Sequence, residues 1–88
     1  MAKLVWVAQL HISERTADKL ADKHGISADD VRSHVQRVGN LRGAWDYHPQ
    51  RGLRLLLKVP MEEQMILVVL YPRDDSDEAW NLGSAYPV

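Results

Sequence analysis

The chain has 88 residues, of which 45% are hydrophobic and 26% are charged, with a formal net charge of -1 and no cysteine. This length predicts a single domain over residues 1–88, and the composition excludes an intrinsically disordered chain. The lack of cysteine excludes a disulfide framework and a thiolate metal site. Because no apolar run is long enough for a membrane span or a signal peptide, we expect a cytoplasmic protein without a membrane partner.

Charge is distributed unevenly along the chain. Residues 32 to 58 contain six arginine or lysine residues and one aspartate, whereas residues 59 to 88 contain six carboxylates and one arginine. Two interpretations follow. The charges either cancel across neighbouring strands, or the middle segment forms a local anion-binding face.

The first third of the chain predicts a strand followed by two helices. Residues 4 to 7 form a β-branched and aromatic run typical of a strand. Ser13 is an expected N-cap, and Gly25 ends the helix that follows. A second helix is expected to begin after Ser27, with Asp30 completing a capping box, and to continue to Val38.

From Trp45 onward the pattern changes to the alternation of strands. A hairpin is predicted with its turn at residues 49 to 52, followed by an almost wholly apolar strand over residues 64 to 71 and a last strand over residues 79 to 87. The predicted fold is α+β, with two N-terminal helices packed on a four- to five-stranded, mainly antiparallel sheet. The three tryptophans are expected to pack in its core.

The register of the hairpin decides which side chains meet water. An odd loop, such as residues 48 to 52, places Trp45 and Tyr47 on the core face with the leucines of the second strand. The opposite face then collects charged and polar side chains, namely Asp46, His48, Arg54 and Lys58. An even loop would bury Asp46 and His48 among leucines at a cost of roughly several kcal/mol, so we expect the odd loop.

This polar face contains the groups needed for phosphodiester cleavage. His48 could move a proton near neutral pH, while Arg51, Arg54 or Lys58 would offset charge that develops on the phosphate. The competing interpretation is a solvated hairpin tip. No metal-ligand spacing is present among the four histidines, so neither a metal nor another cofactor is expected.

The position of Tyr86 depends on one glycine. Strict alternation places Tyr86 on the inward face with Trp80 and Leu82. A bulge at Gly83 would reverse that parity and turn Tyr86 towards the basic face.

Several segments together resemble the BrnT-like members of the RelE toxin superfamily, which are small bacterial ribonuclease toxins. The resemblance covers most of the chain and rests on the element order and on three segments, Val5-Trp6-Val7, Lys23-His24-Gly25-Ile26-Ser27 with Asp29-Asp30-Val31, and Ile66 to Tyr71. The final segment Trp80-Asn81-Leu82-Gly83-Ser84-Ala85-Tyr86-Pro87 looks like the last strand of related toxins.

The resemblance implies a RelE-like fold and a metal-independent endoribonuclease of the toxin–antitoxin type, with RNA as substrate and an antitoxin protein as partner. On this hypothesis the catalytic residues are His48, Arg54, Lys58 and Tyr86, and the RNA-binding residues are Arg51, Arg73 and Arg42. BrnT-like chains typically end this strand with Ser-Ala-Arg, where this chain has Ser84-Ala85-Tyr86. Either Tyr86 replaces the basic residue as a proton donor or acceptor, or the activity is lost.

The alternative hypothesis is a non-catalytic protein-interaction module on the same fold, including a homodimer formed through an exposed sheet edge. A DNA-binding role for the helix pair is a third and weaker hypothesis, because Arg32 and Arg37 have little base-reading chemistry beside them.

Overall fold

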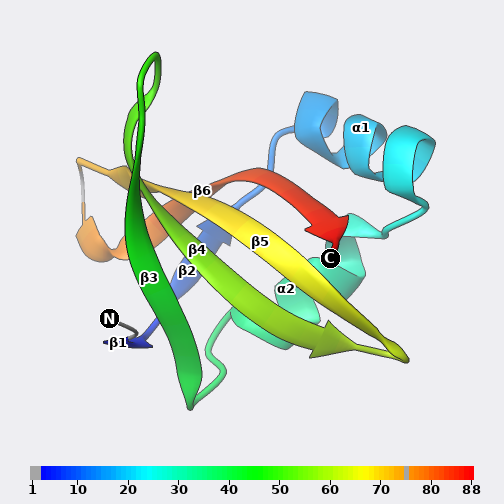
Figure 1. Ribbon diagram of the computed structural model, residues 1–88, viewed down its shortest axis with the longest axis horizontal. Coiled ribbons are helices and arrows are strands. Elements are labelled where there is room, and N and C mark those ends of the chain that lie inside the picture. The colour runs from blue at the N-terminus through cyan, green and yellow to red at the C-terminus, as the bar shows by residue number, and fades with distance from the viewer. Residues whose placement is uncertain (1–2, 75) are drawn as a thin grey trace.

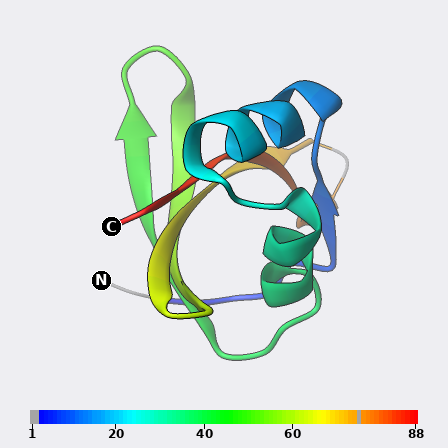
Figure 2. The same cartoon turned by 90° about the vertical axis from the view of Figure 1, so that its right-hand side faces the viewer.

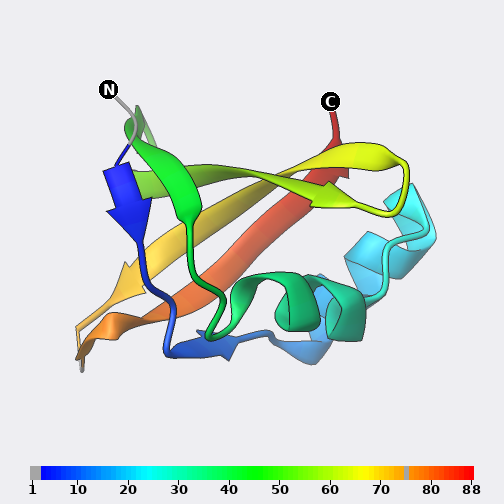
Figure 3. The same cartoon turned by 90° about the horizontal axis from the view of Figure 1, so that it is seen from below.

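The computed structural model describes residues 3–74 and 76–88. In chain order, the elements of this part are β1 (Lys3–Val5), β2 (Gln9–His11), α1 (Glu14–His24), α2 (Ala28–Val35), β3 (Leu41–His48), β4 (Gly52–Met61), β5 (Gln64–Arg73) and β6 (Ser76–Pro87). The strands form one curled sheet, and both helices lie on the same side of it (Figure 1, Figure 3).

The sheet differs from the one expected from the sequence. It has six strands within the described residues, in the order β1-β3-β4-β5-β6-β2, and β2 runs parallel to β6. The expected RelE-like sheet of four to five mainly antiparallel strands is therefore wrong. β2 gives little sequence signal because it has only three residues, two of them polar, and its partner lies at the far end of the chain.

The core lies between the helices and the concave face of the sheet, which curls around them (Figure 2). Its fully buried side chains are aliphatic and come from every layer, namely Val7, Leu10, Leu20, Val31, Val35, Leu55, Leu57, Val59, Val68 and Leu70. No polar or charged residue of the described part is buried. The ionisable side chains of the described part consequently lie at or near the surface.

Local caps explain the bounds of α1. Ser13 Oγ accepts the backbone N–H of Thr16 at 3.1 Å, and Gly25 adopts the left-handed conformation with φ of 63°. The expected cap positions of this helix are therefore confirmed.

α2 begins after Ser27 as expected, but its N-terminal cap and its C-terminal end differ from the expectation. Ser27 makes no side-chain capping bond, so the expected capping box is wrong. The helix ends at Val35 because the next residue, Gln36, turns to an extended conformation and its Oε1 accepts the N–H of Leu10 at 2.9 Å. Arg32 donates to the carbonyl of Leu10. These bonds attach β2 to α2.

The hairpin of β3 and β4 has the predicted odd register. His48 pairs with Gly52, Asp46 with Arg54 and Trp45 with Leu55. However, the hairpin tip extends beyond the helices (Figure 1), so Trp45 is 42% exposed and Tyr47 is 71% exposed. Trp6 is also 44% exposed, so of the three tryptophans expected in the core only Trp80, at 6%, is buried.

A β-bulge at Gly83 reverses the parity of β6. Leu70 pairs with Leu82, but its neighbour Val69 pairs with Ser84, which leaves Gly83 as the extra residue. Ala85 then faces the core, and Tyr86 faces outward.

Neither α1 nor α2, the helices of the described residues, has the length and apolar character needed to cross a bilayer.

Candidate functional site

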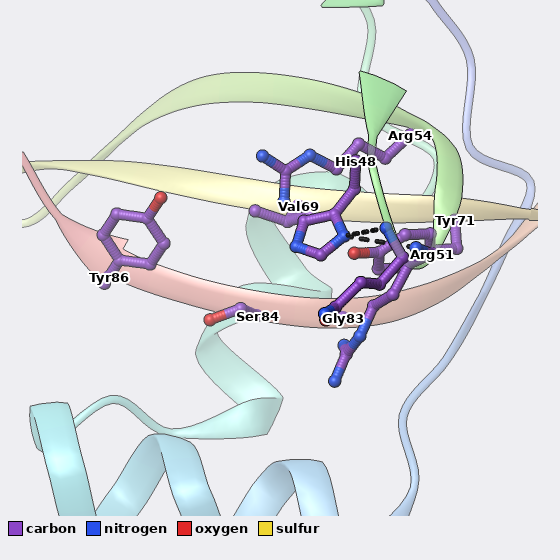
Figure 4. Close-up of a pocket in the computed structure, with 9 residues that line it drawn as sticks. His48, Arg51, Arg54, Val69, Tyr71, Gly83, Ser84 and Tyr86 are labelled. Atoms are coloured by element: carbon purple, nitrogen blue, oxygen red, sulfur yellow. Dashed lines mark hydrogen bonds between the residues drawn. The ribbon is translucent and has the colours of Figure 1, made fainter. Parts of the chain in front are cut away.

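A cavity of about 220 Å³ lies on the outer face of the sheet, between the hairpin tip and strands β5 and β6. Its lining residues are His48, Gln50, Arg51, Arg54, Val69, Tyr71, Gly83, Ser84 and Tyr86. Figure 4 shows the imidazole of His48, the guanidinium of Arg54 and the phenols of Tyr71 and Tyr86 around this space, whereas the side chain of Arg51 extends past Gly83 towards α1. Among the described residues, no aspartate or glutamate lines this cavity.

His48 is held by the turn that follows it. Its Nδ1 accepts the backbone N–H groups of Gln50 and Arg51, both at 3.1 Å (Figure 4). Because Nδ1 is an acceptor in this geometry, the tautomer inferred for the neutral ring carries its proton on Nε2. His48 is therefore a hydrogen-bond donor towards anything bound at Nε2.

Arg54 is oriented by a carboxylate on the neighbouring strand. Its Nε donates to Oδ2 of Asp46 at 2.7 Å, across the register predicted from the sequence. Hydrogen bonding to Asp46 and then to Tyr71 raises the pKa of Arg54 above its ordinary value. Asp46 partly offsets this charge, so the attraction of the cavity for an anion depends strongly on Arg51 as well.

Hydroxyl groups complete the lining. Tyr71 comes from β5, and Ser84 and Tyr86 come from β6 beyond the bulge. The ring centroid of Tyr86 lies 6.1 Å from the ring centroid of His24, which belongs to α1. Reasoning from the sequence missed Tyr71 and Ser84. Alternation along β5 could have indicated Tyr71, whereas Ser84 depends on the bulge.

Four expected site residues come together, and three do not. His48, Arg51, Arg54 and Tyr86 line the cavity. Lys58 is exposed and lies farther along β4, in the same cross-strand row as Tyr86. Arg42 pairs with Leu4 of β1, and Arg73 donates to Asn81 at 2.9 Å beside other cavities. Of the seven expected site residues, only the first four can therefore contact a ligand in this cavity.

Within residues 3–74 and 76–88, no group of three or more histidine, aspartate or glutamate side chains is arranged to hold a metal ion. Comparisons with family models, curated proteins and solved structures found no match to this chain. Function is therefore inferred from the chemistry of the cavity.

Proposed function

We propose that this protein is a metal-independent endoribonuclease, as its resemblance to the BrnT-like toxins implies. The observation that supports the proposal is the convergence of an imidazole donor, two guanidinium groups and three hydroxyls on one surface cavity. Arginine is well suited to phosphate because its planar group donates two parallel hydrogen bonds. No carboxylate among the described residues lines the cavity, so no lining side chain of this part repels a bound phosphate.

The proposed reaction is attack of the ribose 2′-oxygen on the adjacent phosphorus. The bond from phosphorus to the 5′-oxygen breaks, and the products end in a 2′,3′-cyclic phosphate and a 5′-hydroxyl. Arg51 and Arg54 stabilise the charge on the phosphoryl oxygens, and Nε2 of His48 donates a hydrogen bond to one of them. Because a neutral imidazole that gives up its only proton becomes an unfavourable anion, His48 acts as a donor and not as the general acid.

Tyr86 is assigned the proton transfer. Its phenol oxygen accepts the proton of the 2′-hydroxyl while its own proton passes to a phosphoryl oxygen, and the departing 5′-oxygen takes up that proton as its bond to phosphorus breaks. A hydroxyl is required, and a basic residue is not. This assignment is the alternative in which Tyr86 replaces the arginine of the BrnT-like ending.

The test is cleavage of a single-stranded RNA in the presence of a chelator, with Tyr86→Phe as the matched variant. We expect cyclic phosphate ends from the wild type and a loss of about 10²–10⁴-fold in rate for Tyr86→Phe. A strand of the same sequence lacking 2′-hydroxyls is the control and should stay intact. Intact RNA with the wild type would refute the nuclease, and cleavage of the deoxy strand would refute the mechanism.

A homodimer that serves as a protein-interaction module is the second candidate, and a different observation favours it. β1 pairs with β3 only as far as Gly43, and in the described part no strand pairs with the outer edge of β3 from there to the hairpin tip. Tyr47 and Leu53 expose apolar surface at this tip. An open edge of this kind pairs readily with a copy of itself. Analytical ultracentrifugation should then show a dimer that Tyr47→Lys converts to a monomer, whereas a wild-type monomer would exclude this candidate.

A further inference from the structure

A second cavity, of about 250 Å³, lies between α1 and β6 and adjoins the first. Its lining residues are Thr16, Lys19, Leu20, Lys23, His24, Arg51, Gly83 and Ser84. Arg51, Gly83 and Ser84 also line the cavity of His48. The two cavities are therefore neighbouring parts of one surface, with Arg51 and Ser84 between them.

The rotation of α1 directs its two lysines, Lys19 and Lys23, to this surface. Leu20 is buried in the core and fixes which face of the helix turns inward. Lys19 and Lys23 are four residues apart, so they lie one above the other on the flank that lines the cavity. The helical carboxylates form a separate row at the same spacing, Glu14, Asp18 and Asp22, and none of them lines either cavity.

Stabilisation of the helix end does not account for both lysines. Cations near a helix C-terminus interact favourably with the helix dipole, and this accounts for Lys23 and His24 in the last turn. The effect falls off within one turn, and Lys19 lies before it. Lys19 nevertheless lines the cavity, together with the hydroxyl-bearing residues Thr16 and Ser84.

We infer that the RNA strand extends from the cavity of His48 into the second cavity, where Lys19 and Lys23 bind the phosphate next to the scissile one. This inference rests on the proposed nuclease function and adds a second phosphate-binding site to it. An oligonucleotide carries regularly spaced anions, which matches two adjoining cationic cavities. A single strand is required because the reacting ribose and phosphate must rotate into line, and the A-form duplex holds them out of line.

The test is the salt dependence of binding, measured with a deoxy strand that cannot be cleaved. Lys19→Gln and Lys23→Gln should each weaken binding and reduce the slope of log Kd against log salt by about 0.7, the value for one lost single-strand contact. Arg15→Gln is the matched control, because it removes one charge from the same helix at a position that lines neither cavity. Its slope should equal that of the wild type.

A dinucleoside monophosphate, which has one phosphate, provides the second arm. It should bind the two lysine variants as well as it binds the wild type, since its phosphate occupies the cavity of His48. Equal losses for both ligands, or equal slopes for Lys19→Gln and Arg15→Gln, would overturn the inference while leaving cleavage intact. A wild type that neither binds nor cleaves RNA would instead overturn the proposed function.

Discussion

The imidazole of His48 has two separate tasks, and a substitution can divide them. Nδ1 caps the hairpin turn by accepting two backbone N–H groups, whereas Nε2 faces the cavity as a donor. The side-chain oxygen of asparagine can accept the same turn N–H groups but offers no group at the position of Nε2. His48→Asn should therefore retain the turn and lose the donor.

We expect His48→Asn to lower the cleavage rate by about 10²–10³-fold, as for the loss of one hydrogen-bond donor to a developing charge. His48→Ala leaves both N–H groups without their acceptor and should lower the free energy of unfolding by about 1 kcal/mol. His48→Asn should lower it by less. Urea unfolding and cleavage assays on the two variants measure these effects. Equal destabilisation by both substitutions would contradict the capping role of Nδ1.

The raised pKa of Arg54 predicts that its contribution to phosphate binding is independent of pH. Asp46 and then Tyr71 raise the pKa of Arg54 in the folded state above its value in the unfolded state. The stabilisation that comes from its positive charge is therefore fully present below the ordinary arginine pKa and is lost only as the pH rises above it. The ratio of Kd between Arg54→Gln and the wild type, measured with a dinucleoside monophosphate, should be equal at about pH 5 and about pH 9. A ratio that falls towards pH 9 would show that Arg54 loses its proton in this range.

At the scale of residues, the sequence predicted the part of the site that depends on alternation alone. His48, Asp46 and Arg54 share a face because any other register would bury charge among leucines. Lys58 obeys the same alternation and shares their face, yet it does not line the cavity, because strand β5 separates it from Tyr86 in the same cross-strand row. Alternation gives the face of a residue, and only the tertiary structure gives its distance from the others.

The bulge on β6 is the element that completes the site. A Cβ atom at Gly83 would lie 2.3 Å from Cε2 of Tyr71, whose ring lines the cavity. Gly83→Ala should therefore displace Tyr71 and destabilise the fold by about 1–3 kcal/mol, as overpacking does. Adding Tyr71→Ser should remove the clash, so the double variant should lose less stability than the two single losses combined. Additive losses in urea unfolding would contradict this contact.

The elements that sequence reasoning placed well are those with local causes. α1 is defined by Ser13 and Gly25 at its own ends, so its bounds followed from neighbouring residues. β2 and the early end of α2 depend instead on contacts between distant segments, through Leu10, Arg32 and Gln36. The parallel pairing of β2 with β6 is of the same kind, because no periodicity within three residues can specify a partner near the other end of the chain.

The whole molecule brings together cations from two parts of the chain that are far apart in sequence, helix α1 and the hairpin of β3 and β4. Lys19 and Lys23 come from α1, Arg51 from the hairpin turn and Arg54 from β4. The charge count by segment identified only the middle group, because the carboxylates of α1 cancel its lysines in sequence but occupy a different face in space. A net charge of -1 is therefore compatible with a local anion-binding surface.

One shared core predicts that helices and sheet unfold together. Leu20 of α1 and Leu55 of β4 belong to the same cluster of buried residues, although they come from different layers. Leu20→Ala and Leu55→Ala should each lower the free energy of unfolding by about 2–5 kcal/mol, a large part of the 5–15 kcal/mol typical of a domain. In urea, helical circular dichroism and tryptophan fluorescence should report one coincident transition in each variant. If Leu20→Ala instead released the helical signal at a lower urea concentration than the fluorescence change, α1 would be an independent unit, and its lysines would not be held at the cavity.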